Sequence, residues 1–248
     1  NQRRRRTRRT RRTRRTNRIV NKDLKKRLNT VTEKIKSAEK RSPFGNKVKV
    51  VAVTKTKPFS CIIDVYQLGI TSIGENRVND AIEKFESSKN MPMVEKRFIG
   101  HLQSNKTKKC VTAFDTIDSI HSLKLLKKIS RECQKEKKTI KALLEINTSA
   151  ETQKKGFLLE DINEILQCFE VQNVQVEGLM TMAPFTKDEK TVRSCFSLLR
   201  QMKNKLNKLL PLKPIKELSM GMSNDYEIAI EEGATQIRLG TVLFGARN

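Results

Sequence analysis

The sequence predicts an α/β fold, a single TIM-type (β/α)8 barrel with one helix in front of it. From residue 48 onward, short apolar runs alternate with amphipathic segments, as in the βαβ units that build a parallel sheet. Eight such units in a chain of 248 residues match one barrel. Polar and glycine-containing stretches follow the predicted strands, where barrels carry their functional sites. A doubly wound sheet is the alternative that a strand count leaves open.

Residues 1–18 differ from the rest of the chain, because they hold eleven arginines and no acidic residue. Like charges repel and nothing here can be buried, so we predict a disordered segment in front of a folded domain spanning residues 19–248. That domain carries 41 basic and 27 acidic residues, but its lysines are scattered over predicted helix faces. Nucleic acid is expected to bind only non-specifically, through residues 1–18.

The spacing of apolar residues predicts the elements of the folded part. Leu24, Leu28, Val31 and Ile35 recur every three or four positions and predict a helix over residues 19–40. The predicted strands are 48–54, 71–74, 97–100, 116–119, 142–147, 174–182, 217–220 and 236–239. The predicted helices between them are 61–68, 79–85, 105–111, 123–135, 158–169, 189–210 and 225–231.

The sequence also argues against several classes of protein. No GxGxxG motif follows a predicted strand and no Walker-type motif occurs, so neither kind of nucleotide site is expected. The five cysteines form no CxxC pair, which argues against a disulfide framework and a structural zinc site. No apolar run approaches a membrane span. We therefore predict a cytoplasmic protein without a metal site or membrane partner, and a mitochondrial location stays open.

The stretch VKVVAVTKTKP, residues 48–58, organises the candidate site. Its apolar run suits a strand buried on both faces, and Pro58 prevents the strand from continuing. Lys55 and Lys57 lie in between. A lysine held against apolar walls loses its proton more easily and becomes a nucleophile toward carbonyl groups. A polar strand end in contact with water is the alternative interpretation.

The predicted loops after strands seven and eight have the features of a phosphate site. Both contain glycine, and the hydroxyls of Ser223 and Thr241 can add to the backbone N–H groups there. A phosphate site facing Lys55 is the arrangement that pyridoxal 5′-phosphate (PLP) requires, and Arg238 can reach the ring nitrogen. Because arginine stays charged, it would keep that nitrogen unprotonated. The alternative for Arg238 is an ion pair across the barrel mouth with Glu75.

Seven stretches, in order along the chain, carry a resemblance to a known family. They are VAVTKTKP (51–58), GEN (74–76), FIGHLQSNK (98–106), INTSAETQKKGF (146–157), GLMTM (178–182), LSMGMSNDYEIAI (218–230) and RLGTVLFGAR (238–247). In these stretches the chain resembles the pyridoxal phosphate homeostasis protein family, single-barrel relatives of alanine racemase. The resemblance implies an alanine-racemase-like barrel of PLP fold type III.

The resemblance also implies roles for individual residues, all of them in cofactor binding. Lys55 would form the Schiff base with PLP, Asn76 would lie beside the cofactor and Arg238 would face the ring nitrogen. Four residues, Ser219, Ser223, Gly240 and Thr241, would surround the phosphate.

Three residues depart from the family's pattern. Thr54 stands where serine is usual, Arg77 where tyrosine is typical and Arg97 where histidine is usual. The two arginines are expected to add positive charge near the barrel mouth.

The function that the resemblance implies is intracellular PLP homeostasis, meaning that the protein buffers PLP and delivers it to apoenzymes without catalytic turnover. A PLP-dependent amino-acid racemase or related enzyme is the alternative. Racemisation needs a second acid or base opposite the lysine, and racemase relatives take a tyrosine from a second domain of the partner subunit. Here both tyrosines fall in predicted helices, and His101 is expected to bind the backbone instead. An open barrel mouth without a second domain is compatible with a monomer, so we expect the protein to be monomeric.

Overall fold

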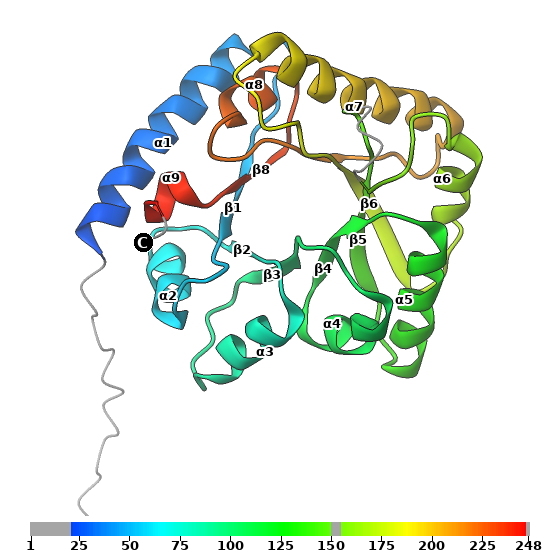
Figure 1. The fold of residues 1–248 in the computed structure, drawn as a ribbon, viewed down its shortest axis with the longest axis horizontal. Helices are drawn as coiled ribbons and strands as arrows, with labels where there is room; N and C mark the ends of the chain where they lie inside the picture. Colours follow the sequence, from blue (N-terminus) through cyan, green and yellow to red (C-terminus); the bar gives the residue numbers. More distant parts are fainter. Residues whose placement is uncertain (1–20, 150–154, 247–248) are drawn as a thin grey trace, which may run out of the picture.

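The chain folds into a closed barrel of eight parallel strands, β1 to β8 in chain order, with helices around it (Figure 1). The structure is a computed structural model that describes residues 21–149 and 155–246. Each strand pairs with the next, and β8 pairs with β1, where Val51 lies opposite Arg238. The predicted (β/α)8 barrel is confirmed, and the doubly wound alternative is wrong. The segment 1–18, predicted to be disordered, lies outside the described residues.

All the predicted strands and helices have counterparts in the structure. The strands are β1 (Lys49–Val53), β2 (Ser72–Glu75), β3 (Glu95–Phe98), β4 (Thr116–Ile120), β5 (Ile140–Glu145), β6 (Val174–Met180), β7 (Glu217–Ser219) and β8 (Gln236–Leu239). The helices are α1 (Lys22–Arg41), α2 (Phe59–Gln67), α3 (Val78–Glu86), α4 (Thr107–Ala113), α5 (Leu123–Lys135), α6 (Ile162–Cys168), α7 (Glu189–Leu209), α8 (Tyr226–Glu231) and α9 (Thr241–Phe244), with a 3₁₀ turn, η1, at Ser104–Lys106.

Two elements differ from the prediction for physical reasons. The helix α9 was not predicted, because four residues are too few to display a helical period. The strand β3 begins at Glu95, two residues before the predicted start, and ends at Phe98. Its polar first residues do not have the apolar pattern of a buried strand, because Glu95 and Arg97 take part in polar contacts of the barrel interior.

The helix α1 covers the side of the barrel where β8 meets β1, and it packs against α8 and α9 (Figure 1). The side chain of Asn21 caps its first turn by accepting hydrogen bonds from two backbone N–H groups. Leu24, Val31 and Ile35 are buried, as the periodicity predicted. At its other end, Arg41 Nε donates a 2.7 Å hydrogen bond to Glu231 in α8.

Apolar side chains fill the layer between the strands and the helices. Ile62, Ile129 and Phe196 are fully buried there, and Phe98 packs edge-on against Phe114 with ring centroids 5.3 Å apart. Because this layer faces outward from the strands, the inward side chains are free to be polar. Within the part of the chain that the structure describes, no helix is long and apolar enough to cross a membrane.

Candidate functional site

Lys55 lies two residues beyond the end of β1, at the carboxyl end of the barrel, and is half-buried. The chain turns sharply there, because the N–H of Lys57 donates to the carbonyl of Thr54 at 3.0 Å. Thr56 has a φ of 63°, a left-handed conformation that is rare for a β-branched residue. Such local strain persists where surrounding contacts fix the backbone, and it occurs often at functional sites.

A buried ion pair fixes the backbone beside Lys55. Lys84 Nζ lies 2.6 Å from Glu75 Oε1 and donates to the carbonyl oxygen of Thr54 at 2.8 Å. The hydroxyl of Thr54 donates to the same carboxylate oxygen at 2.7 Å. Glu75 is therefore engaged by Lys84, and the alternative in which it pairs with Arg238 is wrong. The residue that precedes Lys55 is tied to α3 and β2 through both its carbonyl and its hydroxyl.

Asn76 follows β2 and is half-buried in the same mouth. The loop after β3 lies against its backbone, since a Cβ at Gly100 would stand 2.2 Å from the carbonyl oxygen of Asn76. Only glycine permits this approach, and the contact holds the two neighbouring loops together.

The loops after β7 and β8 meet at Ser223. Its hydroxyl oxygen accepts hydrogen bonds from the N–H groups of Gly240 at 3.3 Å and Val242 at 3.2 Å. Thr241, between them, is exposed. The turn before Ser223 requires Gly221, whose φ is 94° and where a Cβ would lie 2.5 Å from that of Ala229. Three of the four residues predicted to surround a phosphate are therefore neighbours.

Arg238 and Ser219 form a separate pair inside the barrel. Arg238 is 4% exposed, and its Nη1 donates to Ser219 Oγ at 2.7 Å while its Nη2 donates to the carbonyl of Thr181 at 2.9 Å. Ser219 is fully buried and also accepts a 2.9 Å hydrogen bond from Gln236. Burial lowers the pKa of Arg238, and the charges of acidic residues, Asp118 first among them, oppose that shift.

A chain of hydrogen bonds continues from Gln236 across the barrel interior. Gln236 Nε2 donates to Asp118 Oδ2 at 3.1 Å, and Asp118 receives two hydrogen bonds from Arg97, at 2.9 and 3.0 Å. Arg97 also donates to Glu95 at 2.8 Å. Burial disfavours the charged form of Arg97, but the charges and hydrogen bonds of Asp118 and Glu95 outweigh this effect and raise its pKa. The interior thus links Arg97 to Arg238 through fixed polar contacts.

Arg97 was expected to add positive charge near the barrel mouth, and this prediction is wrong. Its side chain is 4% exposed, points into the barrel and is neutralised by Asp118 and Glu95. The reason is strand geometry, since successive side chains alternate between the two faces. Arg77, by contrast, has a side chain that is 76% exposed and lies 3.7 Å from Asp80.

The other half of the mouth holds Glu145 and Lys155, to which the sequence assigned no role. A cavity of about 530 Å³ lies between the loops after β3 to β7, and Glu145, Asn147, Lys155 and His101 line it. Burial raises the pKa of Glu145 to about 7, against the attraction of Arg238 and Lys155. His101 was expected to bind the backbone, but its Nε2 lies 2.8 Å from Lys155 Nζ. Glu145 ends β5, so the same strand-end argument that selected Lys55 could have found it.

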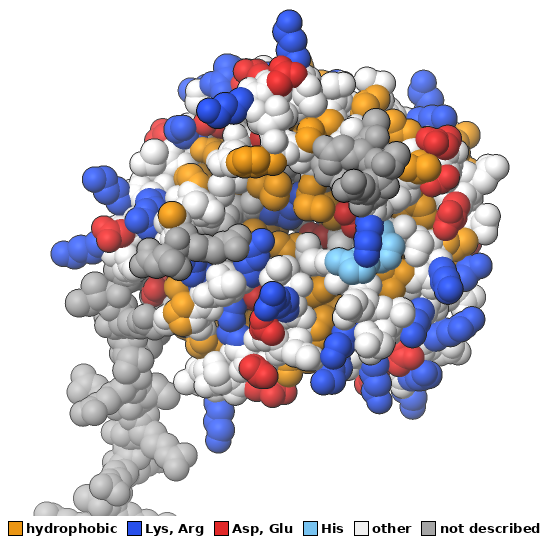
Figure 2. All heavy atoms as spheres, viewed as in Figure 1, with side chains coloured by type: hydrophobic (Ala, Val, Ile, Leu, Met, Phe, Trp, Pro, Cys, Tyr) orange, Lys and Arg blue, Asp and Glu red, His pale blue; other side chains and the backbone are white. Residues whose placement is uncertain are grey.

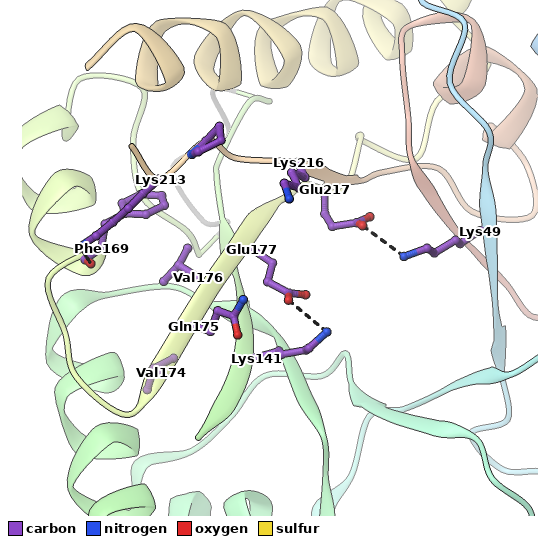
Figure 3. A pocket seen from close by; sticks show the side chains of 11 residues that line it. Lys49, Lys141, Phe169, Val174, Gln175, Val176, Glu177, Lys213, Lys216 and Glu217 are labelled. Carbon is purple, nitrogen blue, oxygen red and sulfur yellow. Dashed lines mark hydrogen bonds and ion pairs between the residues drawn. The ribbon is translucent and has the colours of Figure 1, made fainter. Parts of the chain in front are cut away.

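A cavity of about 560 Å³ lies at the opposite end of the barrel (Figure 3). Two of its lysines form ion pairs with its glutamates, with Lys49 3.3 Å from Glu217 and Lys141 3.0 Å from Glu177. In barrels of this type the amino ends of the strands serve stability, and sites lie at the carboxyl ends. The face with the mouth is the one in Figure 2, where histidine side chains lie beside the central hollow.

Comparisons with known proteins agree with this geometry. Residues 27–248 match the family described as alanine racemase, N-terminal domain. The pyridoxal phosphate homeostasis protein of Aquifex aeolicus is 37% identical over 223 residues, which cover 89% of this chain and 97% of that protein. The protein of the same name from Mus musculus is 32% identical over 238 residues, with 89% and 86% covered.

Solved structures give the same result. PipY of Synechococcus elongatus without PLP has a TM-score of 0.81 at 33% identity, with 90% of this chain and 100% of that chain covered. Its structure with PLP bound has a TM-score of 0.79 at 32% identity, with the same coverage. An alanine racemase of Clostridium difficile is 16% identical, with a TM-score of 0.70. The match covers 91% of this chain and 56% of the racemase chain, and at this identity it shows a shared fold alone.

The barrel and the residues at its mouth define a relative of the alanine racemase barrel. Within that class, the chain belongs to the pyridoxal phosphate homeostasis protein family.

Proposed function

We propose that the protein binds PLP at the carboxyl end of the barrel, with Lys55 forming the Schiff base, and that it acts in PLP homeostasis. The observation that carries this proposal is the presence of three complementary features in one mouth. They are a half-buried strand-end lysine, a cluster of hydroxyl and N–H groups at Ser223, and the buried guanidinium of Arg238. Relatives that cover most of the chain are named for PLP homeostasis, and one was solved with PLP bound.

The donor groups fit a phosphate. The N–H groups of Gly240 and Val242 both point at the hydroxyl oxygen of Ser223, and Thr241, which lies between them in the chain, is exposed. Backbone N–H groups and hydroxyls that converge in this way suit an anion. Asn76, on the other side of Lys55, would contact the cofactor ring or its substituents.

Arg238 fits the ring nitrogen. Two of its N–H groups are used by Ser219 and Thr181, and a guanidinium has five. Among the described residues no carboxylate lies within ion-pair distance of it, so a neutral acceptor can take a remaining N–H. We assign Ser219 to holding Arg238 in place, in addition to its predicted position near the phosphate.

PLP, when bound, supplies an aldehyde that condenses reversibly with amines. The role of the chain is then to hold that aldehyde at Lys55 and to release it. We propose a carrier that buffers PLP and passes it to apoenzymes, in the cytoplasm and as a monomer. The racemase alternative is not supported, because the racemase structures resemble this chain in fold alone.

The test is the visible absorption spectrum of the purified protein with PLP, before and after borohydride. We expect a yellow protein that borohydride bleaches, and loss of this behaviour in Lys55→Ala. Lys57→Ala, two residues away, is the matched control and should retain it. A protein that stays colourless with added PLP would refute the proposal. Transfer of PLP from the loaded protein to an apoenzyme, and light scattering on the eluted peak, would test the carrier role and the monomer.

A further inference from the structure

The proposed PLP site uses the loops after β1, β2, β7 and β8, and it leaves the cavity in the other half of the mouth without a role. This cavity, of about 530 Å³, lies in the range of small-molecule sites in proteins. Its polar groups are few and its walls are mainly apolar, which is also typical of such sites.

One side of the cavity is positively charged. Lys155 Nζ lies 2.8 Å from His101 Nε2, and the His101 ring is 4.8 Å from that of His121. Burial lowers the pKa of both histidines, and the charge of Lys155 adds to this effect. These shifts favour the neutral form of both rings, and Lys155 supplies the positive charge, with its ammonium group beside His101 Nε2.

Among the described residues that line this cavity, one carries a carboxyl group, and it lies deeper than Lys155. Glu145 is 8% exposed and ends β5, and its backbone carbonyl accepts a 2.8 Å hydrogen bond from Phe157. Among the described residues, no ion pair within 4.0 Å joins Glu145 to Lys155. The cavity thus presents an acidic and a basic group that face the same space without neutralising each other.

The remaining wall is apolar and adaptable. Met180, Met182, Ala183, Phe185 and Met222 line it. Phe185 is 97% exposed and Met182 is 39% exposed, so this wall continues to the surface. Methionine side chains are unbranched and polarisable and adapt to ligands of different shape.

We propose that this cavity binds a free α-amino acid with an apolar side chain, its ammonium group at Glu145 and its carboxylate at Lys155 and His101. A simple anion would lie unfavourably close to the carboxyl group of Glu145, and a simple cation would lie unfavourably close to the ammonium group of Lys155. A purely apolar ligand would leave both groups without polar partners. A zwitterion with an apolar side chain satisfies all three surfaces. One consequence rests on the proposed function: the cavity then selects which amines reach the cofactor held at Lys55.

The test is isothermal titration calorimetry with L-methionine, N-acetyl-L-methionine, which lacks the ammonium group, and L-methioninamide, which lacks the carboxylate. The full chain is used both without PLP and after loading and borohydride reduction, which fixes the cofactor to the protein. We expect L-methionine to bind at least about tenfold more tightly than either derivative, because each derivative leaves one charged group of the cavity unpaired.

Two variants assign the charges. Glu145→Gln should abolish the preference for L-methionine over its N-acetyl derivative, and Lys155→Met should abolish the preference over the amide. Lys141→Met, in the cavity at the opposite end of the barrel, should change neither. Circular dichroism confirms that each variant is folded, and saturation-transfer NMR serves as a second measure of binding.

Equal affinity for the three compounds, or no binding by both methods at millimolar concentration, would overturn the proposal. Binding to the chain without PLP tests the cavity alone. If L-methionine binds but PLP does not, the cavity stands and the proposed PLP function fails. If PLP binds but L-methionine does not, the proposed PLP function stands and the proposed amino-acid site fails.

Discussion

Arg238 donates a 2.7 Å hydrogen bond to Ser219, and both side chains are buried inside the barrel. We predict that Ser219→Ala loosens the guanidinium and weakens its contact with the PLP ring nitrogen. The loaded variant should then show a pH-dependent absorption change, as the nitrogen becomes able to take a proton, that the unsubstituted protein lacks. Its stability should fall by about 1.5–3 kcal/mol, the range for a hydrogen bond to a charged group. A variant that loses stability but keeps a pH-independent spectrum would show that Ser219 serves the fold alone.

Removal of the Ser223 hydroxyl should weaken binding of the phosphate and leave binding of the ring unchanged. We expect Ser223→Ala to bind PLP about tenfold less tightly, since a hydrogen bond to a charged group contributes about 1.5–3 kcal/mol. Affinity for pyridoxal, which lacks the phosphate, should not change. Equilibrium dialysis with both ligands measures the difference. The matched control is Ser122→Ala, because Ser122 caps α5 away from the site; an equal loss for both ligands would contradict the assignment.

The ion pair of Lys84 with Glu75 should matter much more than an ion pair on the surface. Their side chains are 11% and 3% exposed, so Lys84→Met leaves a buried carboxylate without its partner. We expect a loss of about 3–5 kcal/mol in the free energy of unfolding, measured by urea denaturation. The comparison is Lys34→Met, whose partner Glu227 lies at the surface and where a change of about 0–1 kcal/mol is expected. Similar losses in the two variants would refute the argument.

The pair of Arg97 and Asp118 should behave as one unit. Arg97→Met leaves Asp118 charged and fully buried, and we expect it to cost about 3–5 kcal/mol of stability. The double variant Arg97→Met with Asp118→Leu removes both charges and should recover part of that loss. A double-mutant cycle measures the coupling. Additive losses would show that the two side chains do not depend on each other.

Glu145 should make the stability of the protein fall as the pH rises from about 4.5 to about 7. Its pKa is raised by burial from 4.5 to about 7, so the folded state binds the proton more tightly than the unfolded state. The contribution is therefore complete below pH 4.5 and lost as the pH passes through 7. We expect Glu145→Gln to gain up to about 3 kcal/mol relative to the natural chain between pH 5 and pH 8. Urea denaturation at both pH values tests this, and a constant difference would contradict it.

The strand-end argument located Lys55, Asn76, Ser223 and Arg238 because it depends only on where buried strands stop. In a barrel of parallel strands, the carboxyl ends of all strands lie at the same mouth, whichever side chains the strands carry. The contacts inside the barrel could not be predicted in this way. Asp118 meets Gln236 only because β4 and β8 lie on opposite sides of the barrel and both side chains point inward.

Other misses have equally specific causes. Arg97 was expected near the mouth because it directly precedes the FIGHLQSNK stretch, whereas it is the third residue of β3 and its side chain is buried against Asp118 and Glu95. Glu145 was overlooked because the predicted fifth strand continued to residue 147, so its end was read two residues too late. An error of two residues leaves a side chain on the same face of the sheet, but it moves the residue along the barrel axis, toward or away from the mouth.

The pairing of β8 with β1 has a consequence for how the molecule is made. Val51 lies opposite Arg238, so Lys55 follows the first strand, whereas the groups expected to hold the phosphate follow the last two strands. During synthesis, Lys55 leaves the ribosome nearly 200 residues before its partners. A growing chain therefore carries the reactive amine long before it can retain the cofactor, and capture of PLP would report that the last strand has docked. Bound PLP would then link the two ends of the sheet, β1 and β8, where their pairing closes the barrel.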